Sequence, residues 1–127
     1  NMMRWLFCVL LLTCLSSCEA SADAEMVLSA LHRGDSLAIV KQDDWDLVMQ
    51  YTNYTIAVVA FISHKCSFCK QLKEPWNEVA KQAAGQILFV EIDIEDTDFQ
   101  LGKLTSQHNI DKTPSVLVMR KGARAQP

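Results

Sequence analysis

Residues 55–84 read T-I-A-V-V-A-F-I-S-H-K-C-S-F-C-K-Q-L-K-E-P-W-N-E-V-A-K-Q-A-A, and their pattern predicts the central unit of the fold. It begins with an apolar, β-branched run, Thr55 to Ile62, whose length is typical of a buried strand. A helical pattern follows, because apolar residues recur at spacings of three and four: Leu72, Trp76, Val79, Ala80 and Ala83. The run Cys66-Ser67-Phe68-Cys69 therefore lies where a buried strand passes into a helix N-terminus.

The position of Cys66 and Cys69 predicts redox chemistry. The unpaired N–H groups and the positive dipole end of a helix N-terminus favour a thiolate. Lys65, Lys70 and a protonated His64 would add positive charge nearby. Such settings lower the pKa of a cysteine from about 8.5 to roughly 3.5–7.5. We expect Cys66, at the helix start, to be the attacking thiolate, and Cys69, one turn further on, to resolve a mixed disulfide.

Apolar periodicity and turn residues predict further elements on both sides of this unit. Strands alternate with helices, which indicates an α/β domain with a mixed sheet. The predicted elements are a helix over Asp23–Leu31, a strand over Leu37–Val40, a helix capped by Asp43 or Asp44 and ending at Tyr51, a strand over Ile87–Ile94, a helix over Phe99–His108 capped from Asp96-Thr97-Asp98, a strand over Ser115–Met119 and a hairpin turn at Lys121-Gly122.

The central unit resembles the thioredoxin superfamily. The strand, the Cys-x-x-Cys, Lys70 and a helix that contains Pro75 and Trp76 match the family pattern, and Lys-x-Leu-x-x-Pro-Trp after the second cysteine is similar to protein disulfide isomerase domains. The resemblance covers about residues 37–122. It implies a thioredoxin-like fold over residues 37–127, with a mixed central sheet flanked by helices. In that fold a further strand and a closing helix follow the turn at Gly122. We expect this chain to lack both, so that the domain is incomplete at its C-terminus.

The resemblance also implies how a substrate is bound. Thr113-Pro114 resembles the cis-proline loop of the family, where the proline packs beside the Cys-x-x-Cys and the preceding residue pairs with an extended substrate. We therefore expect a cis bond before Pro114, and substrate contacts from Thr113 and Pro114. A trans proline that opens a strand is the alternative. Phe68, inside the motif, is expected to be exposed and to give peptides an apolar contact.

Three features of the sequence depart from the family pattern. Ala60 stands six residues before Cys66, where the family commonly places a buried Asp or Glu that assists proton transfer from the resolving cysteine. Lys65 replaces an aromatic residue, and Ser67-Phe68 replaces the Gly-His of efficient isomerases. Dithiol exchange remains possible, but we expect its resolution step to be slow.

Residues 1–22 are predicted to be a secretory signal peptide. Arg4 precedes the apolar run Trp5–Leu15, and Ala20-Ser21-Ala22 offers a cleavage site for signal peptidase. Residues 23–36 then form an N-terminal extension. An uncleaved membrane anchor is one alternative, although the run is shorter than the ~20 residues that span a bilayer.

A second alternative concerns Cys18. Leu15-Ser16-Ser17-Cys18 resembles the lipobox of bacterial lipoproteins, which would attach a lipid to Cys18. The protein would then lie in the bacterial envelope or periplasm. With a cleaved signal peptide, it would instead be secreted or lie in the lumen of the endoplasmic reticulum. Membrane association is expected only from a lipidated Cys18 or an uncleaved signal.

Composition and charge narrow the classes of protein to which this chain can belong. The chain has 127 residues, enough for one domain, and its net charge of −3 offers no basic surface for nucleic acid. Three of its five cysteines, Cys8, Cys14 and Cys18, lie in the N-terminal segment. A mature chain that keeps only Cys66 and Cys69 has no structural disulfide framework. We expect a monomer that needs no cofactor.

Two further sites were weighed. Zinc would need His64, Cys66, Cys69 and His108 together, but the chain lacks the second Cys-x-x-Cys typical of structural zinc, so we predict no metal. Asn53-Tyr54-Thr55 is an N-glycosylation sequon, relevant only in a eukaryotic secretory pathway.

The sequence thus favours a thiol–disulfide oxidoreductase of the secretory pathway. It would act on protein or peptide thiols and disulfides, as a protein disulfide isomerase domain does. The alternatives are a bacterial envelope lipoprotein with reducing activity and a non-catalytic module that binds client proteins.

Overall fold

The apolar run before the cysteines forms β2, Ile56–Ile62, the central strand of the sheet. The predicted helix follows directly as α4, Ser67–Gln82, and the chain returns through β3, Ile87–Asp93, which pairs with β2 in parallel. The computed structural model describes residues 22–126. The predictions for the signal peptide, Cys8, Cys14 and Cys18 therefore lie outside the described residues.

The sheet has five strands in the order β1-β3-β2-β4-β5. β1, Leu37–Ala38, is parallel to β3, whereas β4, Ser115–Arg120, is antiparallel to β2. This arrangement confirms the predicted mixed sheet. The sequence analysis placed no strand beyond the turn at Gly122, but the structure has the two-residue β5, Ala123–Arg124, antiparallel to β4. No helix follows β5 within the described part of the chain.

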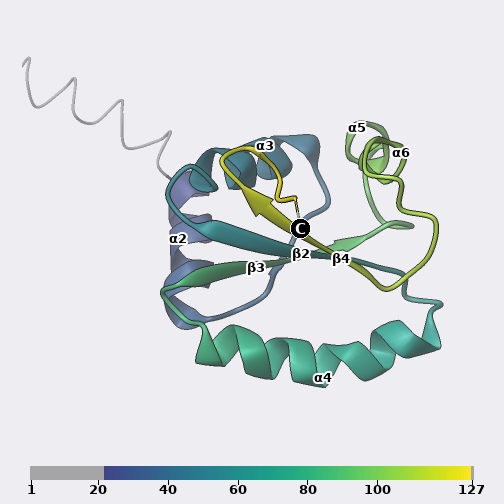
Figure 1. Cartoon of the computed structure of the whole chain (residues 1–127), viewed down its shortest axis with the longest axis horizontal. Helices are drawn as coiled ribbons and strands as arrows, with labels where there is room; N and C mark the ends of the chain where they lie inside the picture. Colours follow the sequence, from purple (N-terminus) through teal and green to yellow (C-terminus); the bar gives the residue numbers. More distant parts are fainter. Residues whose placement is uncertain (1–21, 127) are drawn as a thin grey trace, which may run out of the picture.

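Side chains alternate between the two faces of the sheet. Ala57, Val59 and Phe61 of β2 face the larger core, which they share with α2, Ala22–Arg33, and α3, Gln42–Tyr51. α5, Phe99–Gly102, and α6, Leu104–Gln107, cover the same face, and Figure 1 shows α3, α5 and α6 above the sheet. The helices that cover this face thus come both from before β2 and from after β3 in the sequence.

The opposite face of the sheet is covered by α4 alone among the described helices (Figure 1). Its buried cluster is small and consists of Ala60, Trp76, Ala80 and Phe89. The Trp76 and Phe89 rings meet edge to face, with centroids 5.0 Å apart. Val116 and Val118 of β4 remain 49% and 40% exposed. The side of the sheet behind Cys69 is therefore thinly covered.

The start of α3 differs from the prediction, whereas the start of α5 agrees with it. Neither Asp43 nor Asp44 caps α3, whose N-cap is Lys41 with no side-chain hydrogen bond. The N–H of Gln42 instead donates to Oδ2 of Asp98 at 3.2 Å. Oδ1 of Asp98 also accepts the N–H of Leu101 at 2.7 Å, which confirms its predicted cap on α5. One carboxylate therefore serves two helix N-termini.

The predicted helix over Phe99–His108 is divided into α5 and α6 at Lys103, so its continuity was wrong. The predicted turn at Lys121-Gly122 is confirmed, and both residues adopt positive φ, 53° and 74°.

Within residues 22–126, no helix has both the length and the apolar character needed to cross a membrane.

Candidate functional site

Cys66 is the N-cap residue of α4. Its extended backbone places Sγ over the helix start, where it accepts the N–H of Cys69 at 3.2 Å. Sγ also lies 3.5 Å from the carbonyl oxygen of Thr113. The hydrogen bond with the Cys69 thiol lowers the pKa of Cys66 most, and the contacts with Thr113 and with the N–H groups of Cys69 and Phe68 act in the same direction. Cys66 is therefore the thiol that ionises first.

Cys69 lies one turn further along α4, and it is 6% exposed. Burial is the main cause that raises the pKa of Cys69, and the hydrogen bond with Cys66 adds to it. Both cysteines are free thiols in the structure. The pair thus combines a partly exposed thiol of lowered pKa with a buried thiol of raised pKa.

The loop before β4 faces this pair. The Thr113–Pro114 bond is cis, which confirms the prediction, and both residues are half-buried. The Thr113 carbonyl oxygen lies 3.5 Å from Sγ of Cys66. Phe68 is 68% exposed on the first turn of α4. The structure therefore brings Thr113 to Cys66 and leaves Phe68 in solvent.

Comparison with known proteins agrees with this geometry. The sequence model of the family described as Thioredoxin matches residues 36–127. The chain belongs to the thioredoxin family. No curated protein matches the sequence. The family supports a general thiol–disulfide oxidoreductase activity for this domain.

Solved structures share the fold at low sequence identity. Thioredoxin f from spinach chloroplast matches with a TM-score of 0.66 and 13% identity, over 78% of this chain and 77% of that chain. Plasmodium falciparum thioredoxin matches with a TM-score of 0.60 and 19% identity, over 71% and 81%. A redox protein from Chlamydomonas reinhardtii matches with a TM-score of 0.67 and 21% identity, over 74% of this chain and 30% of that chain. These likenesses show the thioredoxin fold.

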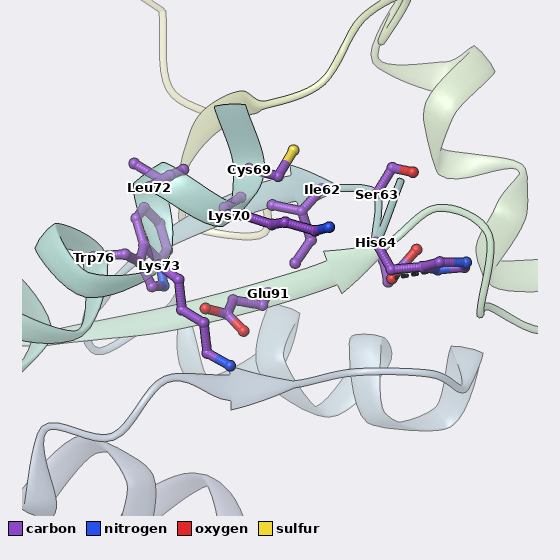
Figure 2. A pocket seen from close by; sticks show the side chains of 11 residues that line it. Ile62, Ser63, His64, Cys69, Lys70, Leu72, Lys73, Trp76 and Glu91 are labelled. Atoms are coloured by element: carbon purple, nitrogen blue, oxygen red, sulfur yellow. Dashed lines mark hydrogen bonds and ion pairs between the residues drawn. The ribbon is translucent and has the colours of Figure 1, made fainter. Parts of the chain in front are cut away.

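A cavity of about 250 Å³ lies behind the redox pair of this thioredoxin-family domain (Figure 2). Ala60, Ile62, Leu72 and Trp76 give it apolar walls, and Cys69 lies at one side. Glu91 lines the same cavity and is the direct partner of Ala60 in the parallel pair of β2 and β3. The sequence analysis missed Glu91, which it treated only as part of the predicted strand over Ile87–Ile94. Strand alternation from Phe89 would have assigned Glu91 to the face that α4 covers.

His64 lines the same cavity and lies between two carboxylates. Its Nδ1 is 3.2 Å from Oδ2 of Asp93, and its Nε2 is 3.2 Å from Oε2 of Glu95. The His64 side chain is 60% exposed, so these contacts contribute little to stability. The ligand atoms of His64, Asp93 and Glu95 lie within 4.8 Å of one another, close enough to hold a metal ion, and the absence of a metal stays a prediction.

The alternative zinc set is not assembled. His64, Cys66, Cys69 and His108 do not form a group with mutually close ligand atoms within the described residues. His108 follows α6, where its backbone oxygen accepts from Nη1 of Arg124 at 3.4 Å. Burial, followed by the charge of Arg124, lowers the pKa of His108.

The sequon residue Asn53 lies in the exposed turn between α3 and β2. Its Nδ2 donates to the carbonyl oxygen of Gln50 at 3.1 Å. An exposed turn is accessible to modification, and glycosylation of Asn53 stays a prediction.

Proposed function

We propose that this chain is a thiol–disulfide oxidoreductase that acts on protein disulfides, as protein disulfide isomerase domains do. One observation carries the proposal: Sγ of Cys66 accepts the N–H of Cys69 at 3.2 Å at the start of α4. A thiolate at this place is the nucleophile of dithiol exchange. Phe68 and the loop of Thr113 and Pro114 border Cys66, and they would hold an extended peptide there.

The reaction needs only the two cysteines and the substrate. The Cys66 thiolate attacks one sulfur of the substrate disulfide, and the other substrate sulfur leaves as a thiolate that takes a proton from water. Cys69 then loses its proton and attacks Cys66, which releases the second substrate sulfur. Two electrons pass from the protein dithiol to the substrate. An added small thiol reduces the Cys66–Cys69 disulfide for the next turnover.

Insulin reduction in the presence of a small thiol tests this function. We expect the protein to accelerate the reaction above the rate of the thiol alone, and Cys66→Ser to lose that acceleration. Equal rates for the protein and Cys66→Ser would overturn the proposed activity. Circular dichroism of both forms verifies that they are folded.

We further propose that the protein works in the lumen of the endoplasmic reticulum or outside the cell. The support is the predicted signal peptide over residues 1–22. The intact mass of the mature chain tests this location, since cleavage near Ala22 removes Cys18. A diacylglycerol mass on Cys18 would instead favour the bacterial envelope, and an added glycan at Asn53 would favour a eukaryotic secretory pathway.

A second function is favoured by the exposure of Phe68. An aromatic side chain 68% exposed beside a peptide-binding loop fits a module that holds client proteins without catalysis. Peptide binding that survives Cys66→Ser, combined with no insulin reduction by the parent protein, would support this function.

A further inference from the structure

The proposed reaction leaves one proton without an evident acceptor. Cys69 must lose its proton as it attacks the Cys66 sulfur, yet burial raises its pKa. Ala60 of β2 lies behind Cys69, and its methyl group cannot accept a proton. An acceptor must therefore come from another element that lines the same space.

The small side chain of Ala60 leaves that space open. The cavity behind Cys69 has a volume of about 250 Å³, whereas one water needs roughly 10–15 Å³ for its centre. The cavity is therefore large enough for several waters, and polar side chains at its margins offer them hydrogen bonds. Water in it would connect Cys69 with groups on β3.

Glu91 is the carboxylate that this cavity brings to the back of Cys69. Ala60 and Glu91 are paired in the parallel strands, so both side chains project toward α4. Figure 2 shows Glu91 rising from β3 on the side of the cavity opposite Cys69. Glu91 is half-buried, and its carboxylate makes no hydrogen bond or ion pair with the described residues. No direct hydrogen bond joins Glu91 and Cys69, so a proton would travel through water.

The other charged groups that face the cavity are poor acceptors. Lys70 and Lys73 of α4 end in ammonium groups, which donate hydrogen bonds and have no lone pair to accept one. His64 also lines the cavity, but each of its ring nitrogens lies 3.2 Å from a carboxylate oxygen. Oδ2 of Asp93 faces His64, and its Oδ1 accepts the N–H of Glu95 at 3.0 Å. β2 contributes no charge to the cavity. Figure 2 shows Lys73 extending from α4 toward Glu91.

We infer that Glu91 accepts the proton of Cys69, through water in this cavity, when Cys69 resolves the mixed disulfide; this inference rests on the proposed function. The S–H bond of Cys69 breaks and the Cys66–Cys69 bond forms. The bond between Cys66 and the substrate breaks, and its electron pair leaves on the substrate sulfur. The proton passes to Glu91 and then to solvent. The carboxylate that the family places at position 60 is thus supplied from β3.

The test is a single turnover with an aromatic disulfide reagent that releases a coloured thiolate. The first equivalent of colour reports attack by Cys66, and the second reports resolution by Cys69. In Glu91→Gln we expect an unchanged first phase and a second phase about tenfold slower at pH 7, less than the 10²–10⁴-fold of a direct general base because water intervenes. Glu78→Gln, which removes an exposed carboxylate from α4, should leave both phases unchanged.

The pH profile separates proton transfer from a structural effect. Above the pKa of Cys69 the thiol is already ionised, so the difference between the parent protein and Glu91→Gln should disappear. A difference that persists at alkaline pH, or no difference at pH 7, overturns the role of Glu91. If Glu91→Gln is poorly folded, Glu91→Ser provides the same comparison. Loss of the first phase in the parent protein would instead overturn the proposed function itself.

Discussion

The two cysteines lie one turn apart on α4, but their surroundings are built differently. Cys66 is held by backbone groups: the N–H of Cys69 and the carbonyl oxygen of Thr113. Cys69 faces a cavity whose properties depend on side chains, chiefly Ala60 and Glu91. Attack by Cys66 therefore depends on backbone groups and on the Cys69 thiol, whereas resolution by Cys69 responds to two positions on neighbouring strands.

Removal of each sulfur in turn gives the largest expected effect. Cys66→Ser should reduce turnover to the background rate of the added thiol, because no nucleophile remains. Cys69→Ser should keep the attack but accumulate a mixed disulfide on Cys66, since nothing nearby displaces the substrate. Intact-mass spectrometry of quenched reactions detects that adduct. Equal accumulation of a mixed disulfide in Cys66→Ser would contradict the assignment of Cys66 as the attacking and Cys69 as the resolving cysteine.

A carboxylate introduced at position 60 tests whether the surroundings of Cys69 limit the resolution step. Ala60→Asp should speed resolution by up to about 10²-fold, because it offers direct general-base help beside Cys69. The gain should be larger in Glu91→Gln than in the parent protein, since the two carboxylates serve the same step. Burial of the carboxyl group should cost about 1–3 kcal/mol of the free energy of unfolding.

Ala60→Asn is the matched control for that variant, because it adds similar volume without an acidic group. Stopped-flow kinetics and chemical denaturation measure the two effects. A folded Ala60→Asp that turns over no faster, together with a parent protein that shows no trapped mixed disulfide, would mean that proton transfer is not limiting.

The two pKa shifts predict opposite pH dependences of alkylation. The pKa of Cys66 is lowered, so its thiolate persists as the pH falls below the ordinary range of a thiol. The pKa of Cys69 is raised, so its thiolate forms only above that range. Below pH 7, iodoacetamide should modify Cys66 well before Cys69, as read by fragmentation of the peptide that carries both. Equal rates would contradict the asymmetry.

The smallest expected effect concerns the substrate side of Cys66. Phe68→Ala should raise the KM for a peptide disulfide severalfold and leave the first-phase rate at saturation unchanged. Stability should change by no more than about 0.5 kcal/mol, because the side chain is largely in solvent. Tyr54→Ala is the control: Tyr54 is 90% exposed and precedes β2, at the end of the strand away from Cys66. An equal rise in KM for both variants would indicate a non-specific effect.

Local sequence patterns predicted most of the fold. β2, Cys66 and α4 were foreseen because strand and helix periodicities change at a single place. The cis bond before Pro114 rested on family resemblance, since propensity alone favours trans. The charge around the site was harder to predict. His64 was expected to add positive charge near Cys66, which stays a prediction; the carboxylates of Asp93 and Glu95 beside its ring were not foreseen.

The remaining differences come from contacts between residues distant in sequence. Glu91 belongs to the site only because β3 pairs in register with β2. The start of α3 was assigned to Asp43 or Asp44, whereas the acceptor for Gln42 is Asp98, 56 positions away. No local pattern contains such information, because it depends on which segments the completed sheet brings together.

The shared carboxylate of Asp98 has a consequence for how the domain opens. It bonds to the N–H groups of Gln42 and Leu101 at once, so a fluctuation that frees one helix start also weakens the other. α3 and α5 should therefore behave as one cooperative unit on the timescale of amide hydrogen exchange. In Asp98→Asn, the protection of both N–H groups should fall together while the amides of β2 keep theirs. The segment before the central strand and the segment after β3 would then unfold locally as a pair, with the sheet between them intact.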